Sequence, residues 1–410
     1  MKKFSLTSGA VALALVLAAC GGSDEAGSSD GGLTGDPIVI GVQSMDAGPA
    51  AFPQNTYGAE AAEHYINNEL GGIDGRPIKL DICSGDSTPE TGVKCANDFV
   101  ASDVPVVFDA YDGASMGAMT PILKSAAIPI VGTLAGQGVA ESADYGTAFY
   151  FSGPLETSAL GMVTVLNKLG KKTASLAVQD LPSSHGYVDD LVKPMGAKLD
   201  VDVSAVYAKV DNLNFQVLSA TELSDKPDVA GVISLPEDGC TGLFQALRQS
   251  GFDGTIFAGS CSQFIDDLGE DAAGAVVQPR LWVPGSYDHA PKEVQDQLDA
   301  FADSMKAVGY EDEQSARSLY SFAGVVNLAK VISGIDGDIT NVAVTEAMKG
   351  LKDFQTFAGP KVTCDGKQWP TRPGACSKQA IFFEVQEDGT LKPTGGSDGY
   401  TELDPAAALG

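Results

Sequence analysis

Hydrophobic and polar positions after about residue 36 fall into two alternating kinds of segment. Short runs are rich in β-branched residues, and longer stretches place apolar residues every three or four positions. The short runs predict strands and the longer stretches predict helices. In the first half of the chain we expect strands at 37–42, 78–82, 105–109 and 128–131, and helices at 57–69, 89–101 and 115–126. This alternation is typical of βαβ units in a parallel sheet.

A second series of the same kind follows. Its expected strands are 173–178, 200–206, 229–234 and 255–257, and its expected helices are 155–169, 186–195, 214–223 and 240–250. Two consecutive doubly wound series predict two α/β lobes. The alternation then stops, because 295–308, 315–332 and 342–349 all read as helices. The tail returns to β structure at 381–385, with a hairpin turn at Asp388-Gly389 before Leu391-Lys392.

The N-terminus has the composition of an export signal. Lys2 and Lys3 precede a short apolar run, which ends in Leu17-Ala18-Ala19-Cys20. This ending resembles the bacterial lipobox, in which the cysteine is acylated and becomes the new N-terminus. We therefore expect a signal peptide at 1–19 and a lipid on Cys20. The alternative is an ordinary secretory peptide whose cleavage site happens to precede a cysteine.

The stretch after Cys20 is rich in Gly, Ser and Asp, so we expect a flexible tether at 20–35. No apolar stretch after it is long enough for a second membrane anchor. The whole chain has 410 residues, which is right for two domains or lobes. Its net charge of −28 argues against a nucleic acid partner, and the acidity suits the solubility of an exported protein.

Six cysteines remain besides Cys20, an even number in an oxidising compartment. Six cysteines allow fifteen pairings, and their positions along the chain favour three local ones. The expected disulfides are Cys83–Cys95, Cys240–Cys261 and Cys364–Cys376. A zinc site is the alternative, but the chain has no CxxC pair and no histidine near these cysteines. We expect no metal site and no cofactor.

Several segments carry a family resemblance that extends over essentially all of the chain from Asp36 on. The segment 38–42 is followed by Gly48-Pro49, and the segment 59–77 ends in Gly71-Gly72-Ile73-Asp74-Gly75-Arg76. Supporting similarity lies at 128–131, 247–252 and 320–328. The chain resembles ABC-importer solute-binding proteins of the leucine/isoleucine/valine-binding type, which have the type I periplasmic-binding-protein fold.

This resemblance implies an α/β fold with two doubly wound lobes and a hinge of three crossovers. The crossovers would lie near 150–153, 276–280 and 356–362. Lobe 1 would comprise 36–152 and 281–356, and lobe 2 would comprise 153–280 and 357–410. Such a protein closes on a small organic solute and delivers it to a membrane permease. We expect a monomer that is held at the membrane by its lipid and has no enzymatic activity.

The resemblance also implies where the ligand lies. Contacts with a ligand carboxylate would come from the turn Gly113-Ala114-Ser115, where a helix begins, and from the loop Leu134-Ala135-Gly136. Ser115 acting only as a helix N-cap is the alternative. In an ungapped alignment the family's ligand-binding serine and threonine fall on Gly113 and Gly136.

The second lobe departs from the family pattern as well. The family's stacking tyrosine falls on His185, and the acidic residue that binds an α-amino group falls on Cys261. A buried ammonium without a carboxylate partner is costly, so these departures argue against an α-amino acid as ligand. Phe52 could supply an apolar wall, and Arg317 could bind a carboxylate or another polar head group. A surface ion pair is the alternative for Arg317.

Two other classes of protein are alternatives to a solute receptor. Gly113-Ala114-Ser115-Met116-Gly117 matches G-x-S-x-G between a predicted strand and a helix, which is the pattern of a secreted serine esterase. A later Asp and His289 would complete its triad, but the chain lacks an oxyanion-hole motif such as HGGG. The third class is a ligand sensor that passes lobe closure to a partner without transport.

Overall fold

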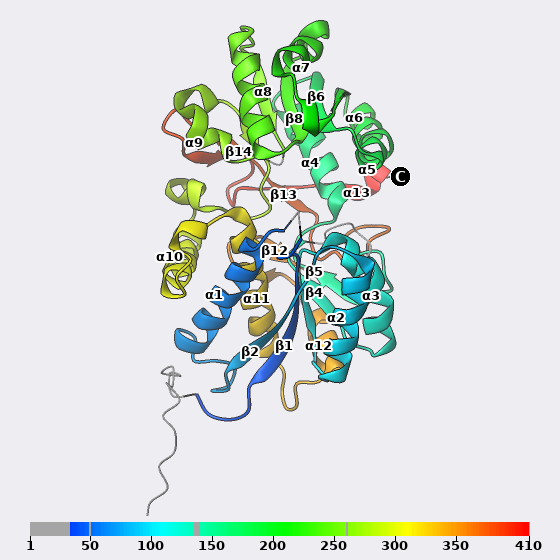
Figure 1. The fold of residues 1–410 in the computed structure, drawn as a ribbon, viewed down its shortest axis with the longest axis vertical. Helices are drawn as coiled ribbons and strands as arrows, with labels where there is room; N and C mark the ends of the chain where they lie inside the picture. The colour runs from blue at the N-terminus through cyan, green and yellow to red at the C-terminus, as the bar shows by residue number, and fades with distance from the viewer. Residues whose placement is uncertain (1–32, 49–50, 135–139, 260, 410) are drawn as a thin grey trace, which may run out of the picture.

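A computed structural model describes residues 33–48, 51–134, 140–259 and 261–409. These residues form two lobes stacked along the longest axis of the molecule, with extended segments running between them (Figure 1). Each lobe has its own parallel sheet, as the two alternating series predict.

The first lobe is built on a five-stranded sheet in the order β2-β1-β3-β4-β5, and every pairing in it is parallel. Ile40 and Val42 of β1 are fully buried, because helices cover both faces of the sheet. The strands are β1 (Ile38–Ser44), β2 (Ile78–Ser84), β3 (Val107–Ala110), β4 (Ile130–Gly132) and β5 (Ala148–Tyr150). The helices between them are α1 (Gln54–Asn68), α2 (Pro89–Ala101) and α3 (Gly113–Ser125).

The second lobe is built on a seven-stranded sheet in the order β15-β14-β10-β9-β8-β6-β7. The part from β10 to β7 is parallel, whereas β14 and β15 pair in antiparallel fashion at one edge. Its strands are β6 (Thr173–Gln179), β7 (Asp202–Ala208), β8 (Val229–Ser234), β9 (Thr255–Ala258), β10 (Val276–Val277), β14 (Phe383–Val385) and β15 (Leu391–Pro393). Its helices are α4 (Leu155–Lys168), α5 (Pro182–Gly186), α6 (Lys193–Lys198), α7 (Phe215–Glu222), α8 (Glu237–Gln249) and α9 (Phe264–Leu268).

Three late helices return to the first lobe, which explains why the strand and helix alternation stops. They are α10 (Lys292–Ala307), α11 (Ala316–Ile332) and α12 (Asn341–Lys349). α11 lies against α1 so closely that a Cβ atom on Gly58 would come within 1.9 Å of the Ser318 carbonyl oxygen. Glycine at position 58 therefore permits the contact between these two helices.

The remaining elements are short and lie between or beside the lobes. Two-stranded pairs form between β11 (Phe354–Gln355) and β12 (Lys361–Val362), and between β13 (Gln379–Ile381) and β16 (Tyr400–Glu402). Helix α13 (Pro405–Leu409) ends the described chain. Strands of two or three residues show little periodicity, so β5, β10 to β12 and β16 were not expected from the sequence, and β13 overlaps the expected segment 381–385 only at Ile381.

The expected helix at 186–195 differs from the structure. It is divided into α5, a π-helical segment at Tyr187–Val192 and α6. Pro194 lies at the start of α6 and has no amide hydrogen to donate, which favours a break in the regular hydrogen-bond ladder at this point. The apolar spacing predicted helical structure but not this interruption.

The structure contains the three disulfides that the order of the cysteines predicts. Cα–Cα distances are 5.8 Å for Cys83–Cys95, 6.3 Å for Cys240–Cys261 and 4.3 Å for Cys364–Cys376. Cys240 and Cys261 meet because they follow β8 and β9, which are neighbours in the second sheet. Over the part of the chain that the structure describes, no helix combines the length and hydropathy needed to cross a membrane.

Candidate functional site

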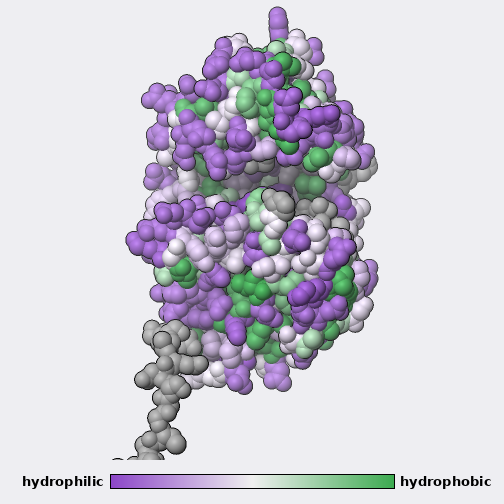
Figure 2. Space-filling model, in the orientation of Figure 1, coloured by the Kyte–Doolittle hydropathy of each residue, from purple (hydrophilic) through white to green (hydrophobic). Residues whose placement is uncertain are grey.

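A cleft separates the two lobes, and the space-filling view shows it as a hollow across the middle of the molecule (Figure 2). The loops that follow β1, β3 and β4 belong to the first lobe, and the loops that follow β6, β8 and β9 belong to the second. In open α/β sheets, ligands bind beyond the carboxyl ends of the strands. These loops are therefore the candidate ligand-binding surfaces.

Arg317 lies at the start of α11, on the first-lobe side of the candidate site. Ser315 caps this helix by accepting a hydrogen bond from the Ser318 amide. The guanidinium carbon of Arg317 is 3.5 Å from the ring centroid of Phe52 and 5.2 Å from that of Tyr111. These are cation–π contacts, and they hold the planar group between two aromatic side chains.

The charge of Arg317 has no ion-pair partner among the described residues. Burial lowers the pKa of Arg317, and Glu237 of the opposite lobe is among the groups that act in the other direction. The group remains positively charged at neutral pH, because an arginine side chain stays protonated in proteins. An anion entering the cleft would meet a partly buried, unpaired guanidinium.

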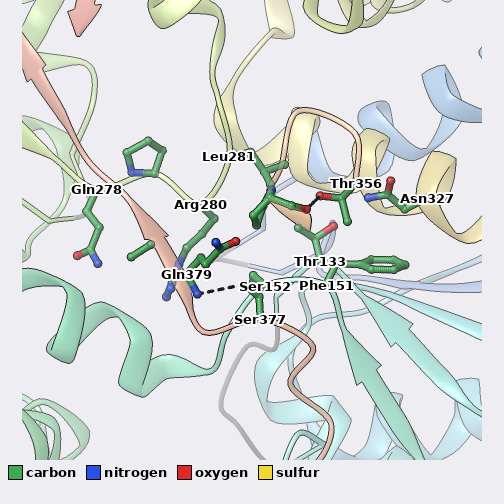
Figure 3. A pocket seen from close by; sticks show the side chains of 13 residues that line it. Thr133, Phe151, Ser152, Gln278, Arg280, Leu281, Asn327, Thr356, Ser377 and Gln379 are labelled. Atoms are coloured by element: carbon green, nitrogen blue, oxygen red, sulfur yellow. Dashed lines mark hydrogen bonds between the residues drawn. The ribbon is translucent and has the colours of Figure 1, made fainter. Parts of the chain in front are cut away.

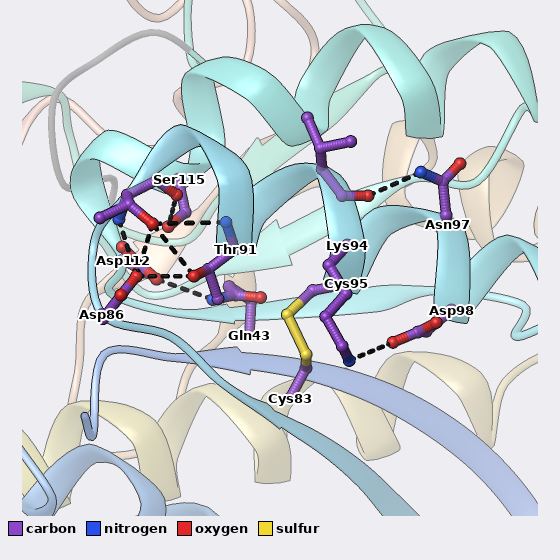
Figure 4. The surroundings of a disulfide bond; sticks show 12 residues. Gln43, Cys83, Asp86, Thr91, Lys94, Cys95, Asn97, Asp98, Asp112 and Ser115 are labelled. Carbon is purple, nitrogen blue, oxygen red and sulfur yellow. Dashed lines mark hydrogen bonds and ion pairs between the residues drawn. A yellow bond between two sulfur atoms is a disulfide. The ribbon is translucent and has the colours of Figure 1, made fainter. Parts of the chain in front are cut away.

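The turn before α3 does not present its hydroxyl to the cleft. Gly113 is the buried first residue of α3, and Ala114 follows it within the helix. Ser115 has no exposed surface, and its Oγ donates to the Thr88 carbonyl oxygen at 3.1 Å. Figure 4 shows this contact beside the Cys83–Cys95 disulfide. The Ser115 hydroxyl therefore links α3 to the start of α2 instead of facing the cleft.

Buried carboxylates lie next to this turn. Asp112 accepts a hydrogen bond from Gln43 at 2.7 Å, and Asp109 accepts one from the Tyr150 hydroxyl at 2.8 Å (Figure 4 for Asp112 and Gln43). Burial raises the pKa of Asp109 to about 7, against the lowering effect of Tyr150. Two acidic side chains under the α3 turn make it a poorer site for a ligand carboxylate than its exposed amides alone would suggest.

The esterase triad is not assembled. His289 lies in the short helical turn Pro284–His289, where its Nε2 is 3.5 Å from the Thr390 hydroxyl beside β15 of the second sheet. Ser115 is buried in the first lobe and already donates its hydroxyl hydrogen. The G-x-S-x-G match therefore reflects a packed helix start, since a nucleophile has to be exposed and within reach of its base.

The loop after β4 is described in part. Leu134 is half-buried, whereas Ala135 and Gly136 lie outside the described residues. The preceding residue, Thr133, donates its hydroxyl hydrogen to the Tyr320 carbonyl oxygen at 2.6 Å. This bond connects the end of β4 to α11, and so to the helix that carries Arg317.

His185 and Cys261 have local partners in the second lobe. The His185 ring stacks on Tyr207 with centroids 3.7 Å apart, and its Nε2 is 3.0 Å from Asp180. Cys261 is bonded to Cys240. Glu237 lies close to this disulfide, but its carboxylate accepts hydrogen bonds from the Ser262 amide at 3.0 Å and the Gln263 amide at 3.1 Å. Since disulfide sulfurs supply no thiolate, these three side chains are not a metal site.

A small cavity lies where the crossing segments meet, lined by residues from both lobes (Figure 3). Its volume is about 10 Å³, which is close to the space of a single water. Arg280 lies at this cavity on the segment after β10, and Thr133 lies there at the end of β4. Their proximity brings the crossover after β10 into contact with the loop that follows β4.

A larger groove, of about 530 Å³, lies between α10, the β11–β12 pair and β16. Charged and amide side chains make up much of its wall, including Glu293, Lys361, Gln379 and Asp398. The carboxyl ends of the main parallel strands do not contribute to it. We therefore regard the cleft between the lobes, rather than this groove, as the candidate site.

Sequence reasoning missed three residues of the candidate site: Tyr111, Arg280 and Tyr320. Tyr111 directly follows β3 and adopts a positive φ of 68°, which is rare for a tyrosine. Arg280 ends the expected crossover at 276–280, and Tyr320 lies one helical turn after Arg317. The spacing from Arg317 was a usable signal for Tyr320, whereas Tyr111 and Arg280 required the tertiary structure.

Comparisons with known proteins agree with this architecture. The Leu/Ile/Val-binding protein homolog 1 of Brucella abortus (strain 2308) is 26% identical over 357 residues, which cover 84% of this chain and 90% of that protein. Two solved structures share the fold. The branched-chain amino acid transporter substrate binding protein LivJ from Streptococcus pneumoniae, in complex with isoleucine, has a TM-score of 0.65 and 18% identity, covering 87% of this chain and 97% of that one.

The second structure is the solute binding protein of an ABC transporter from R. palustris in complex with 4-hydroxybenzoate. Its TM-score is 0.65 and its identity 17%, over 90% of this chain and 98% of that one. These likenesses confirm the type I periplasmic-binding-protein fold that the sequence predicts. The family model described as periplasmic binding protein matches residues 37–390. The chain therefore belongs to the periplasmic binding protein family, whose members bind small solutes outside the cytoplasm.

Proposed function

We propose that this protein is the solute receptor of an ABC importer and that it binds a small organic carboxylate between its lobes. Similarity to substrate-binding proteins of ABC transporters supports the transport role. One observation carries the ligand class: the guanidinium of Arg317 lies between Phe52 and Tyr111 and has no ion-pair partner among the described residues. A ligand carboxylate would supply the missing partner in a planar, two-bond geometry.

The second lobe supports a ligand without an α-amino group. The position expected to hold an ammonium is Cys261, which is used in a disulfide, and the nearby Glu237 carboxylate already accepts backbone amides. Phe52 and Tyr111 favour an apolar or aromatic body next to the carboxylate. The R. palustris protein, which has the same fold, was solved with 4-hydroxybenzoate, an aromatic carboxylate.

We propose that capture proceeds by closure of the lobes around the crossovers. Outside the crossing segments, the described residues form one hydrogen bond between the lobes, the 3.5 Å contact of Thr390 with His289, and no ion pair, which is an arrangement open to ligand. A ligand that contacts both lobes would favour the closed form by its extra contacts there. The permease would then distinguish the closed, loaded receptor from the open one.

We propose boundaries for the two lobes that move relative to each other. From the sequence we expect lobe 1 to comprise residues 36–152 and 281–356, and lobe 2 to comprise residues 153–280 and 357–410. Phe357 packs edge-on against Phe322 of α11, with ring centroids 5.2 Å apart, and this contact favours assigning 357–362 to the first lobe. The third crossover would then be the segment 363–378, which leads to β13.

We further propose a lipid on Cys20, a monomeric state and a purely binding role without catalysis. The lipobox-like sequence supports the anchor. The burial of Ser115 argues against an esterase, because this hydroxyl is out of reach of a substrate. No described observation favours a sensor over an importer receptor.

The test of the ligand class is isothermal titration calorimetry of the exported, full-length protein in detergent. The probes are benzoate, 4-hydroxybenzoate, straight-chain carboxylates, their uncharged amides, leucine and isoleucine. We expect carboxylates to bind and the matched amides to bind at least 10-fold more weakly. Arg317→Met should weaken carboxylate binding by about 10- to 100-fold, since hydrogen bonds to a charged group contribute about 1.5–3 kcal/mol.

Arg76→Met is the matched control, because the half-buried Arg76 lies in the turn before β2 and its guanidinium donates only to the Asp36 carbonyl oxygen. It should leave the affinities unchanged. A thermal shift provides an independent reading, since a ligand at about 100 times its dissociation constant stabilises by about 2.7 kcal/mol. Equal affinities for carboxylates and amides, or an Arg317→Met variant that binds as the wild type does, would refute the proposed ligand class.

A further inference from the structure

The five arginines of the chain differ in how their charges are used. Arg76 and Arg248 donate to backbone carbonyl oxygens, and Arg372 forms an ion pair with Glu156 at 2.7 Å. Among the described residues, the guanidinium groups of Arg280 and Arg317 have neither a carboxylate at ion-pair distance nor a backbone carbonyl acceptor: Arg280 donates to a serine hydroxyl, and Arg317 contacts aromatic rings. Both are half-buried, so neither charge is fully compensated by water.

Arg280 is fixed at the crossover after β10. Its backbone amide donates to the Tyr320 hydroxyl oxygen at 3.0 Å, and its guanidinium Nη2 donates to the Ser158 hydroxyl of α4. The first bond attaches the crossover to the first lobe, and the second attaches it to the second lobe. The Arg280 charge therefore lies at the junction of the lobes, beside the cavity shown in Figure 3.

The nearby acidic groups do not neutralise Arg280. Glu156 already forms an ion pair with Arg372, at 2.7 Å. Glu141 is fully buried, and neither of its carboxyl oxygens has a hydrogen-bond partner among the described residues. Burial and the charge of Glu156 raise the pKa of Glu141 to about 8, although Arg280 and Arg372 act to lower it.

The charge count at the junction follows from these pairings. At pH 7 Glu141 is mostly protonated, because its pKa lies above that pH. Arg280 and Arg372 then share the single negative charge of Glu156. Asp109, which also acts on Glu141, has a pKa of about 7 and carries only part of a charge at pH 7. Positive charge therefore still exceeds negative charge here, and Arg317 adds a further positive charge.

Arg280 and Arg317 both lie near Tyr320. Arg317 precedes it by one turn on α11, and Arg280 contacts its hydroxyl oxygen. Burial raises the pKa of Tyr320, whereas the charges of Arg280 and Arg317 both act to lower it, so both are close to this side chain. Tyr320 is partly exposed.

We propose that the ligand carries two anionic groups, one bound by Arg317 and the other by Arg280, with its body over Tyr320. This inference rests on the proposed function, because it assigns a second contact within the same cleft. It specifies the substrate class as a dicarboxylate or a similar dianion. A monocarboxylate would leave the Arg280 charge unpaired in the closed form, where burial makes that costly.

The experiment compares matched acids by calorimetry on the exported, full-length protein in detergent at pH 7. The pairs are the straight-chain diacids of four to eight carbons, each with the monoacid of the same carbon number, and terephthalate with benzoate. We expect at least one diacid to bind 10-fold or more tightly than its monoacid. In Arg280→Met that ratio should fall to near one, while Arg280→Lys should retain part of it.

Arg317→Met should weaken both acids of a pair, because it removes the contact that they share. Arg76→Met, which alters an arginine in the turn before β2, should change neither. Circular dichroism of each variant verifies that it is folded, and Arg280→Lys keeps the test valid if Arg280→Met does not fold.

Monoacids that bind as tightly as diacids in every pair, or an unchanged ratio in Arg280→Met, would overturn the dianion proposal while the carboxylate receptor stands. No binding of any carboxylate would refute the proposed function itself.

Discussion

Glu222 lies at the end of α7 with its side chain fully buried against the second sheet. One of its carboxyl oxygens accepts a hydrogen bond from the Gly231 amide of β8 at 3.1 Å. Burial raises the pKa of Glu222 well above its ordinary value of 4.5, against the lowering effect of backbone hydrogen bonds. The folded protein therefore holds this proton more tightly than the unfolded chain does.

Glu222→Gln should make the protein relatively more stable as the pH rises. The stability that the protonated Glu222 contributes is fully present below pH 4.5 and is lost as the pH rises toward the folded-state pKa. Glutamine does not titrate, so the variant loses nothing over that range. We expect the difference in unfolding free energy, variant minus wild type, to grow between pH 5 and pH 8 by up to about 1.4 kcal/mol per pH unit.

Urea unfolding followed by circular dichroism at pH 5 and pH 8 measures this difference. Glu270→Gln is the control, because Glu270 is exposed. A difference for Glu222→Gln that stays constant from pH 5 to pH 8 would contradict a buried, protonated Glu222.

Two glycines that lie inside helices differ in how much space surrounds them. Gly58 lies inside α1, where the Ser318 carbonyl of α11 occupies the space of a side chain. Gly117 lies inside α3 with nothing within 4 Å of the position that a Cβ atom would take. Both residues are helical, so a comparison of the two isolates the effect of the helix contact.

Gly58→Ala should destabilise the protein, whereas Gly117→Ala should stabilise it slightly. A methyl group at position 58 has to push α1 away from α11, and overpacking of this kind typically costs about 1–3 kcal/mol. At position 117 the methyl group meets no neighbour, and alanine is preferred to glycine in a helix by about 0.5–1 kcal/mol. Thermal unfolding of both variants checks the opposite signs. A Gly58→Ala protein as stable as Gly117→Ala would show that α1 and α11 are not in the contact described.

The whole molecule combines an acidic folded body with an N-terminal segment that resembles a lipoprotein signal. A body of two lobes with an open cleft has to remain near a permease in order to deliver a solute. A lipid on Cys20 with a flexible tether would keep it there without restricting closure of the lobes.

Cys20→Ser should release the exported protein from the membrane, because serine cannot form the thioether through which the lipid is attached. Phase separation in a detergent that partitions membrane proteins measures this. We expect the wild type in the detergent phase and Cys20→Ser in the aqueous phase. The double variant Cys83→Ser, Cys95→Ser is the control for loss of cysteine, and it should remain in the detergent phase. An aqueous wild-type protein would favour the ordinary secretory peptide instead.

Local sequence patterns were sufficient for most of the scaffold. The strands of both parallel sheets from β1 to β4 and from β6 to β9 lie where apolar β-branched runs predicted them. The inner strands β1, β3, β8 and β9 are buried on both faces, so most of their residues are apolar and the signal is strong, whereas the edge strands β2 and β7 include exposed polar residues. The three disulfides were predictable because each joins cysteines that are close in the sequence.

The sequence was less informative about the candidate site. It singled out Phe52 and Arg317, and the structure brings these two into contact. It also singled out Ser115, which is buried in the packing of α3 on α2, and Gly136, which lies outside the described residues. An ungapped alignment preserves sequence position but contains no information about which way a side chain points.

The sequence by itself determined the two doubly wound series and the pairing of the cysteines, because each depends on residues that are near one another in the chain. Only the tertiary structure decided which charges are left unpaired. Arg280 and Arg317 lie on different segments, and their partners or lack of partners depend on α4, α11 and the crossover after β10 meeting in space. Electrostatic pairing acts over a few ångströms regardless of sequence separation, so local patterns cannot reveal it.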